Sequence, residues 1–414
     1  MVSRRTTERI QGLMTAYQQS GIWAPHNPGQ SGKASPADAR RTNRSLIFSL
    51  LFPDVQLSRA ELGRRTGLSR VAVSDVVNSM LSCHLLRENG RESNGGKGKR
   101  GTLLSVDPDT LHIISIDLSQ PHLIQGEATN LLGEPVMHVE HALRAVNHVD
   151  FDTINEVITP LHAATQNVIG IGLAMPGVVD GNGLVKRSTL LGWRNVDVRT
   201  PIERRFSLPV TVNNDATAAM FTERLFGKGG PNMMFVRLRR GVGGAVLLGD
   251  VPVFGENHAG GEIGHITVNR HETAACGCGK HGCLEQYSSA TGVVRCMKKL
   301  LDENPDADCV LRGKDFEAKD VFDAARSGDA LAAREVDEMT DTLGMALATI
   351  ASTTDPEMFL IGGGVSRAGD VLFDPLVEHF KTYAFKSCRE TPIKAASLGN
   401  DAGIYGAVRL IVGE

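Results

Sequence analysis

Gly261-Glu262-Ile263-Gly264-His265 and Cys276-Gly277-Cys278-Gly279-Lys280-His281-Gly282-Cys283-Leu284-Glu285 form the most distinctive stretch of this chain. Its cysteines follow the spacing Cys-x-Cys-x4-Cys, and the glycines between them let the backbone turn tightly enough to direct all three sulfur atoms to one point. His265 can supply a fourth ligand, and His281 is the alternative fourth ligand. Three thiolates with one imidazole predict a closed, structural Zn²⁺ site, one ion per chain, on His265, Cys276, Cys278 and Cys283. Free buried thiols or a disulfide are the competing interpretation.

The length and composition indicate a multidomain protein of a reducing compartment. A chain of 414 residues is too long for one core and predicts two or three domains. No apolar run approaches the roughly 18 residues needed to cross a bilayer, and the first thirty residues lack a signal-peptide pattern, so we expect a cytoplasmic protein without a membrane partner. An odd number of cysteines agrees with that compartment. The four cysteines outside the cluster are expected to be core residues: Cys83, Cys296, Cys309 and Cys388.

The charge is divided unevenly along the chain. Residues 1–102 carry 16 Lys and Arg against 7 Asp and Glu, a formal charge of +9, whereas the remaining residues carry 28 against 40, a charge of −12. A basic front end on an acidic body predicts that a polyanion binds the first hundred residues only.

Two short helices joined by a glycine turn are expected in this basic part. The pattern becomes helical from Asp38 until Pro53 interrupts it. Ser58 with Glu61 then predicts a capping box that opens a second helix, Gly67 is expected to end that helix, and Ser69 to cap a third. Such a pair is typical of a helix-turn-helix, although a three-helix packing module would give the same pattern.

The polar residues after this turn predict a DNA interface. The N-terminal half of the helix after Ser69 would meet base edges in the major groove, and the basic, glycine-rich segment 87–100 would form a wing whose charges contact phosphates or enter the minor groove. The candidate DNA-binding residues are Ser69, Arg70, Ser74, Asn78, Arg91, Lys97, Lys99 and Arg100.

From about residue 110 the pattern alternates between apolar strands and helices, which predicts an α/β fold with a ligand cleft at the carboxyl ends of the strands. The expected strands are 111–118, 168–174, 210–213, 233–238, 244–248 and 358–361, and the expected helices are 216–226, 331–351 and 402–410.

Five segments of this body resemble one family. They are Gly170 to Asp180, Asn214-Asp215-Ala216-Thr217-Ala218-Ala219, Gly260 to His265, the cysteine cluster ending Cys283-Leu284-Glu285, and Ile361-Gly362-Gly363-Gly364. They are similar to the ROK family of repressors, open reading frames and sugar kinases, over about residues 105–414. The resemblance implies an actin/hexokinase-like (ribonuclease H-like) fold with two lobes around a sugar cleft. A winged helix-turn-helix in front is the arrangement of the family's transcriptional repressors.

The resemblance also implies a division into domains. We expect a flexible arm over 1–37, a winged helix-turn-helix over 38–104, a first lobe over 105–225 plus about 398–414, and a second lobe over 226–397 that carries the zinc site and the oligomerisation surface.

Sugar-binding roles follow from the positions that match the family's motifs. Asn214, Asp215, Glu262, His265 and Glu285 would bind sugar hydroxyls, and His265 would also be a zinc ligand. Carboxylates and amides suit vicinal hydroxyls because they form charge-assisted or paired hydrogen bonds. Asp215 takes the place of the kinases' general base, and would be the catalytic residue if this chain were a kinase. An Asn-Asp turn that only caps the following helix is the competing interpretation of Asn214 and Asp215.

Two departures from the kinase pattern predict that the chain is not an enzyme. Where the kinases have Asp-x-Gly-Gly-Thr, this chain has Asp117-Leu118-Ser119-Gln120-Pro121, and where they have Gly-Thr-Gly-x-Gly-Gly it has Arg239-Arg240-Gly241-Val242-Gly243-Gly244. Phosphoryl transfer depends on positioning the phosphates, so the loss of both loops should abolish it.

The combined prediction is a sugar-responsive transcriptional regulator, a repressor of genes for carbohydrate uptake or catabolism. It would bind a palindromic operator as a homodimer or homotetramer and take a sugar or sugar phosphate as effector between its lobes. The alternatives are a ROK-type sugar kinase with an appended DNA-binding domain, and a regulator controlled by a protein partner. The sequence leaves the identity of the sugar open.

Overall fold

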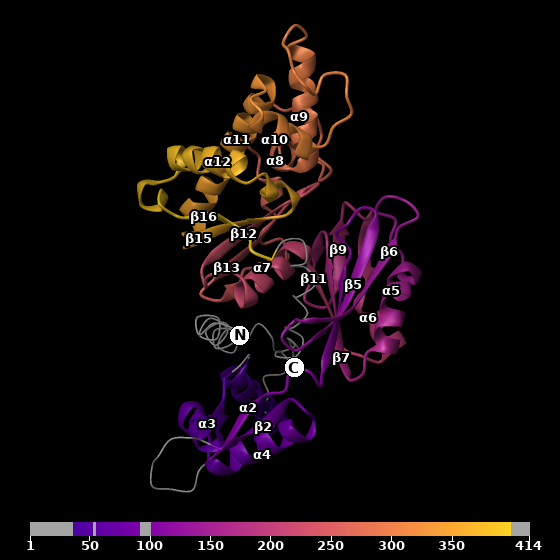
Figure 1. The fold of residues 1–414 in the computed structure, drawn as a ribbon, viewed down its shortest axis with the longest axis vertical. Coiled ribbons are helices and arrows are strands. Elements are labelled where there is room, and N and C mark those ends of the chain that lie inside the picture. The colour runs from indigo at the N-terminus through magenta and orange to yellow at the C-terminus, as the bar shows by residue number, and fades with distance from the viewer. Residues whose placement is uncertain (1–35, 53–54, 92–100, 399–414) are drawn as a thin grey trace.

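The computed structural model describes residues 36–52, 55–91 and 101–398 (Figure 1). Several predictions lie outside the described residues: Pro53, the arm except for its last two residues, Lys97, Lys99, Arg100, the helix at 402–410, and the chain's return to the first lobe after residue 398.

The N-terminal part combines three helices with a small antiparallel sheet. The helices are α2 (Pro36–Leu51), α3 (Arg59–Thr66) and α4 (Arg70–Ser82), and the strands, in the order β1-β3-β2, are β1 (Leu57–Ser58), β3 (Thr102–Val106) and β2 (Leu86–Arg91). The rings of Phe48 and Phe52 stack with centroids 5.4 Å apart inside this core. Helices α3 and α4 follow one another across a short turn, and strands β2 and β3 come after them and pair antiparallel.

The helix ends agree with the capping residues read from the sequence, with one exception. The hydroxyl of Ser58 accepts from the backbone N–H of Glu61 at 3.4 Å, Ser69 caps α4, and Gly67 ends α3 with φ +71°. The reciprocal half of the predicted capping box is wrong, because the carboxylate of Glu61 pairs with Arg64 and Arg65 instead of reaching back to Ser58. Two nearby guanidiniums are stronger partners for a carboxylate than one backbone N–H.

The first α/β unit of the body is built on a five-stranded sheet in the order β11-β7-β4-β5-β6. Strands β11, β7 and β4 are parallel, whereas β5 and β6 continue the sheet antiparallel. Its elements are β4 (His112–Asp117), β5 (Leu123–Asn130), β6 (Pro135–Ala142), α5 (Phe151–Ala164), β7 (Val168–Met175), α6 (Arg199–Phe206) and β11 (Val210–Asn214), with a second small sheet of β8 (Val178–Val179), β9 (Leu184–Ser188) and β10 (Trp193–Asp197).

The second unit is built on another five-stranded sheet, in the order β14-β13-β12-β15-β16, with α7 (Asp215–Phe226) between the two sheets (Figure 1). The strands are β12 (Met233–Leu238), β13 (Val242–Leu248), β14 (Val251–Pro252), β15 (Met358–Gly362) and β16 (Ile393–Ala395). The helices are η1 (Ile263–His265), α8 (Glu285–Ser288), α9 (Ala290–Glu303), α10 (Ala318–Arg326), α11 (Ala330–Thr354), η2 (Gly364–Ala368), α12 (Asp370–Tyr383) and η3 (Lys386–Cys388).

The link between the N-terminal part and the body, residues 107–110, is fixed by hydrogen bonds. The carboxylate of Asp109 accepts from Asn130 Nδ2 at 3.0 Å, and the carbonyl of Pro108 accepts from the backbone N–H of Leu131 at 3.0 Å. The carbonyl of Thr110 accepts from Asn167 Nδ2 at 3.1 Å. One hydrophobic cluster continues from α2 and α4 into the body. The N-terminal part is therefore packed onto the first unit.

All six predicted strands are present, and the helices expected at 216–226 and 331–351 correspond to α7 and α11. Cys309 and Cys388 are buried as expected, whereas Cys83 and Cys296 are only half-buried, and all seven cysteines, each within the described part, are free thiols. No helix among the described residues is both long and apolar enough to span a membrane.

Candidate functional site

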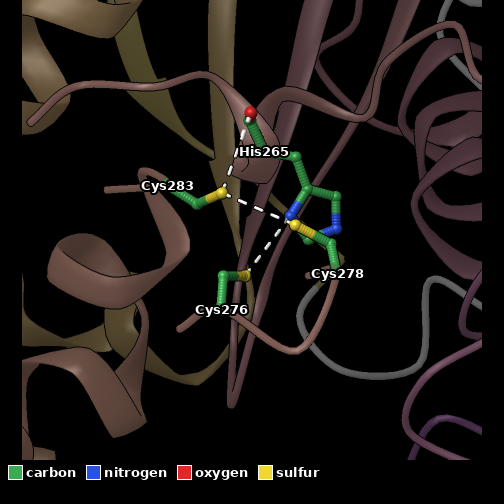
Figure 2. Close-up of side chains that lie close together, drawn as sticks. All are labelled: His265, Cys276, Cys278 and Cys283. Carbon is green, nitrogen blue, oxygen red and sulfur yellow. Dashed lines mark hydrogen bonds between the residues drawn. The ribbon is translucent and has the colours of Figure 1, made fainter. Parts of the chain in front are cut away.

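Four possible metal ligands converge between η1 and α8 (Figure 2). The ligand atoms of His265, Cys276, Cys278 and Cys283 all lie within 4.8 Å of one another. The Sγ atoms of Cys278 and Cys283 are 3.6 Å apart, and Nδ1 of His265 is 3.7 Å from Sγ of Cys276. A tetrahedron of Zn–S bonds of about 2.3 Å has edges of about 3.8 Å, so the separations of 3.6 and 3.7 Å match that geometry and the donor types suit Zn²⁺. His281 is not part of the group.

The loop that carries the cysteines is held by its own backbone and by Glu272. The backbone N–H of Cys276 donates to the carbonyl of Lys280 at 2.7 Å, which closes the turn around Gly279. The carboxylate of Glu272 accepts from the N–H of Ala274 and from the hydroxyl of Tyr287. These hydrogen bonds, the one from Ala274 first, lower the pKa of Glu272 to about 2. The cysteines are therefore positioned by contacts that do not require the metal.

An acidic wall lies next to this centre. Oε2 of Glu262 is 3.8 Å from Nε2 of His265, the ring nitrogen that faces away from the cysteines. Oε2 of Glu285 accepts from the backbone N–H of Val242 at 3.0 Å, which leaves its other oxygen available. Burial first, and then the charges of Asp215 and Glu285, raise the pKa of Glu262. The structure thus brings together three of the five residues predicted to bind hydroxyls, namely Glu262, His265 and Glu285. The charge of Asp215 is near enough to act on Glu262.

Asn214 is mainly a helix cap. Its side-chain oxygen accepts from the N–H groups of Ala216 and Thr217 at 2.8 and 3.2 Å, and its Nδ2 donates to the carbonyl of Gly177 at 2.9 Å. An amide offers two N–H donors and one carbonyl, so a single N–H of Asn214 is left for a ligand. The capping interpretation therefore accounts for most of this side chain.

Asp215 is held in an ion pair that the sequence did not reveal. Its Oδ2 lies 2.6 Å from Nη1 of Arg237, and Nη2 of the same arginine is 4.0 Å from Oδ2 of Asp117. Asp117 and Arg237 are both buried. Burial raises the pKa of Asp215, and Arg237 opposes that shift. One feature of the sequence could have indicated this ion pair. Arg237 is the single charged residue in the otherwise apolar strand 233–238, whose six residues are all buried.

Two arginines of the β12 end share one hydroxyl of the other unit. Nη1 of Arg239 donates to Oγ of Ser119 at 2.6 Å, and Nη2 of Arg237 donates to the same oxygen at 3.0 Å. The serine follows β4 in the first unit and the arginines belong to the second. These bonds therefore connect the two units at the ends of β4 and β12.

The glycine turn after β15 has a packing role. Gly363 has φ +92°, and a Cβ on this residue would lie 2.2 Å from the carbonyl oxygen of Leu238. Only glycine allows this approach of η2 to the end of β12. Gly363 therefore fixes the packing of η2 against the end of β12.

Five of the predicted DNA-binding residues lie in the described part of the chain, where Ser69 caps α4, Arg70, Ser74 and Asn78 lie along it, and Arg91 ends β2. Arg70 and Arg91 are exposed, Ser74 is half-buried, and the hydroxyl of Ser69 is occupied by its cap. Asn78 is exposed, and its Oδ1 accepts from Arg59 Nη2 at 3.2 Å. Sequence reasoning missed Val71, which is 70% exposed beside Arg70 and is a candidate for contact with a thymine methyl group.

Comparisons with known proteins point to one family. The model of the ROK family matches residues 131–414. Glucokinase of Halalkalibacterium halodurans is 38% identical over 270 residues, 63% of this chain and 81% of that enzyme. A putative xylose repressor of Caldicellulosiruptor sp. is 25% identical over 389 residues, 91% of this chain and 96% of the repressor.

The fold has a solved counterpart of nearly the same extent. The crystal structure of a ROK family transcriptional regulator, described as a homolog of the E. coli MLC protein, superposes with a TM-score of 0.80 at 20% identity. The superposition covers 91% of this chain and 97% of that chain. The two-unit α/β body with an N-terminal helical part is therefore an arrangement seen before as a whole.

Proposed function

This chain belongs to the ROK family, and on that basis we propose that it is a sugar-responsive transcriptional regulator, a repressor of genes for carbohydrate uptake or catabolism. The observation that carries the proposal is a pair of short helices with a following antiparallel strand pair, fixed by residues 107–110 to a two-unit α/β body. The likeness to a xylose repressor over 91% of the chain supports it. An operator-binding role would place the protein in the cytoplasm.

The DNA-binding role is assigned to α4 and the hairpin. The exposed N-terminal end of α4, with Arg70 and Val71, would enter the major groove, and Arg91 with the basic residues that follow it would contact phosphates. A palindromic operator would require two such parts, so the chain would act as a homodimer or homotetramer.

The effector is assigned to the cleft between the units. Glu262, Glu285 and His265 would bind hydroxyls, and Asp215 would contribute the edge that its ion pair leaves open. Zn²⁺, when bound by His265 and the three cysteines, would fix the segment that carries these groups. A ligand that contacts both units would favour their closure, and the winged part would move with the first unit and release the operator.

We also propose that the chain does not transfer phosphoryl groups. A general base must be free to accept a proton from the attacking hydroxyl, whereas Asp215 is paired with Arg237 at 2.6 Å. The guanidinium occupies the space between Asp117 and Asp215 and is buried. The rival function is a sugar kinase, which the 38% identity to a glucokinase favours. Consumption of ATP with a panel of hexoses would establish that rival.

The test is fluorescence anisotropy on DNA from the chain's own promoter region at fixed salt, with and without a panel of free and phosphorylated sugars. We expect tight binding that one sugar or sugar phosphate weakens. Arg70→Ala should weaken DNA binding about tenfold or more, because a specific side-chain contact to a base contributes about 1–3 kcal/mol. Arg334→Ala, an exposed arginine of α11, is the matched control and should bind as the parent does.

Glu262→Gln separates the two activities. It should bind DNA with unchanged affinity but resist release by the effector, because the cleft loses a carboxylate and the helix-turn-helix is untouched. DNA binding that no sugar alters would refute the effector role, and absence of DNA binding with ATP turnover would replace the proposal with the kinase.

A further inference from the structure

The tip of the cysteine loop touches the first unit. Gly277 lies between the possible ligands Cys276 and Cys278, and its carbonyl accepts a hydrogen bond from Nη2 of Arg187 at 3.2 Å. Arg187 belongs to β9, in the small sheet of the first unit, whereas the loop belongs to the second unit. A strand that is distant in the sequence therefore contacts the backbone that joins two of the four possible metal ligands.

The same contact has a packing component. A Cβ added to Gly277 would lie 3.0 Å from Cγ2 of Thr189, the residue that follows β9. The φ of Gly277 is not positive, so the nearness of Thr189, and not the backbone conformation, is what disfavours a side chain at this position. Both the carbonyl and the α-carbon of Gly277 thus lie against the first unit.

The flanks of the loop, by contrast, are held within the second unit. Nζ of Lys280 donates to the carbonyl of His265 at 2.8 Å, and Nε2 of Gln286 donates to the carbonyl of Ala274 at 2.9 Å. Neither of these bonds acts on Gly277, which Arg187 contacts from the other unit. The two units therefore hold different parts of the loop.

We propose that Arg187 is a positioning residue of the metal centre, and that the first unit acts through it to control how firmly the loop retains Zn²⁺. The proposal rests on the assignment of Zn²⁺ to His265 and the three cysteines, and on no role in DNA or sugar binding. Release of the metal requires the sulfur atoms of Cys276 and Cys278 to move, and Gly277 must move with them. A guanidinium bound to its carbonyl opposes that movement, because hydrogen bonds with a charged donor are the stronger kind.

The contact also links the metal to the arrangement of the two units. Because Arg187 and the cysteines belong to different units, a separation of the units at this point breaks the bond and weakens retention of the metal. Coupling between two equilibria is reciprocal, so removal of the metal also weakens the attachment of the small sheet to the loop. The metal centre is then a connection between the units as well as a brace within one of them.

The first test is the rate at which the full chain, loaded with Zn²⁺, releases the metal to an excess of a chromogenic chelator at fixed pH and ionic strength. Arg187→Gln should release Zn²⁺ about fivefold faster than the parent, the effect expected for loss of one hydrogen bond that is accessible to solvent. Arg187→Lys keeps a charged donor and should recover part of the difference.

Arg194→Gln is the matched control. Arg194 is an exposed arginine of β10 that lies directly opposite Arg187 in the sheet, and among the described residues it forms no hydrogen bond with the loop. Both substitutions remove one positive charge from nearly the same place, so a difference between them reports the hydrogen bond and not the charge. Arg194→Gln should release Zn²⁺ at the rate of the parent.

A pair of substitutions tests the packing component. Gly277→Ala places a methyl group against Cγ2 of Thr189 and should speed the release of Zn²⁺ severalfold. Thr189→Ser removes that Cγ2 atom, so the double variant Gly277→Ala/Thr189→Ser should return to within about twofold of the parent. A defect confined to the loop would not respond to a substitution in the first unit.

Hydrogen exchange tests the reciprocal effect. Removal of Zn²⁺ by the chelator should speed exchange in the segment that contains Arg187 and Thr189 of the parent, and should change it much less in Arg187→Gln, where the connection is already broken. Unchanged exchange in the parent would refute the link between the metal and the first unit.

The remaining outcomes decide the role of Arg187. Equal release rates for the parent and Arg187→Gln would overturn the proposal, and so would an equal acceleration by Arg194→Gln. Failure of Thr189→Ser to restore Gly277→Ala would overturn the packing contact. A parent chain that takes up no Zn²⁺ would overturn the metal assignment and this proposal with it, whereas the proposed regulatory function would stand.

Discussion

At the scale of single residues, Arg237 serves two carboxylates at once, the buried Asp117 and the half-buried Asp215. It lies 2.6 Å from Asp215 and 4.0 Å from Asp117, and Oδ2 of Asp117 accepts no hydrogen bond among the described residues. Arg237→Met should therefore destabilise the protein by about 3 kcal/mol, because removal of one partner of a buried pair leaves a charge uncompensated. Thermal unfolding measures the loss.

The double variant Arg237→Met/Asp215→Asn is the control for this prediction. It removes the charge that the first substitution leaves behind and should recover part of the lost stability. Equal stability of Arg237→Met and the parent would mean that the ion pair contributes nothing.

Glu335 on α11 makes stability depend on pH. Burial raises its pKa to about 8, assisted by Glu338 and opposed by Arg295 of α9. Between pH 4.5, its ordinary pKa, and pH 8 the unfolded chain has lost a proton that the folded chain keeps, so stability falls as the pH rises through this window. Glu335→Gln should thus raise the melting temperature by several degrees at pH 8 and change it little at pH 4.5.

The exposed Glu303→Gln on the neighbouring α9 is the matched substitution and should have little effect at either pH. A gain from Glu335→Gln of the same size at both pH values would show that packing, and not ionisation, is responsible.

Residues with a local role could be read from the sequence, and residues with a distant partner could not. Ser69 and Gly67 act on their own helix ends, so their roles followed from spacing alone. Arg237 is separated from Asp117 by 120 positions, and nothing in either segment indicates the other. Glu61 shows that even a local pattern fails when a stronger partner, here Arg65, lies one turn away.

At the scale of elements, the cysteine loop is the clearest case for a measurement. We expect the purified chain to contain one zinc ion, and Cys276→Ser to lose it together with effector binding, because the loop carries Glu285 and follows His265. Metal analysis measures the zinc content, and calorimetry measures the affinity for the effector. DNA binding by α4 should be retained, since that helix shares no contact with the loop.

Cys309→Ala changes a buried cysteine outside the cluster and should keep both zinc and effector affinity. A full zinc content in Cys276→Ser would contradict the ligand set.

Elements were predictable where their pattern was strong. The apolar runs of β7 and β12 and the long α11 were found within a few residues, because buried strands and a 25-residue helix leave unambiguous periodicities. Strands β5 and β6 were missed: β6 alternates half-buried and exposed residues and contains three charged or titratable side chains that resemble a loop. Pairing with β5, which only the folded sheet provides, stabilises it there.

At the scale of the whole molecule, the link 107–110 decides whether the two binding sites communicate. Its bonds to Asn130, Leu131 and Asn167 attach the helix-turn-helix to the first unit. Insertion of Gly-Gly between Asp109 and Thr110 should leave DNA affinity and effector affinity within about twofold of the parent but reduce effector-driven release to near nothing. Coupling of this kind amounts to about 1–3 kcal/mol and requires a rigid connection.

The same insertion after Gly313, in a turn between α9 and α10, should leave release intact. Undiminished release after insertion at Asp109 would mean that the signal travels by another route. The domain boundaries expected near residues 104 and 225 stay predictions.

The Arg237 ion pair also bears on how such a chain could change over generations. A lineage that gained phosphoryl transfer would have to free Asp215, yet the first substitution at Arg237 removes the cation that lies between Asp117 and Asp215. Each single step of this kind lowers folding stability before it yields any activity, and selection against unfolded protein removes the intermediates. The ion pair thus acts as an evolutionary ratchet, in which the requirements of folding oppose a gain of catalysis.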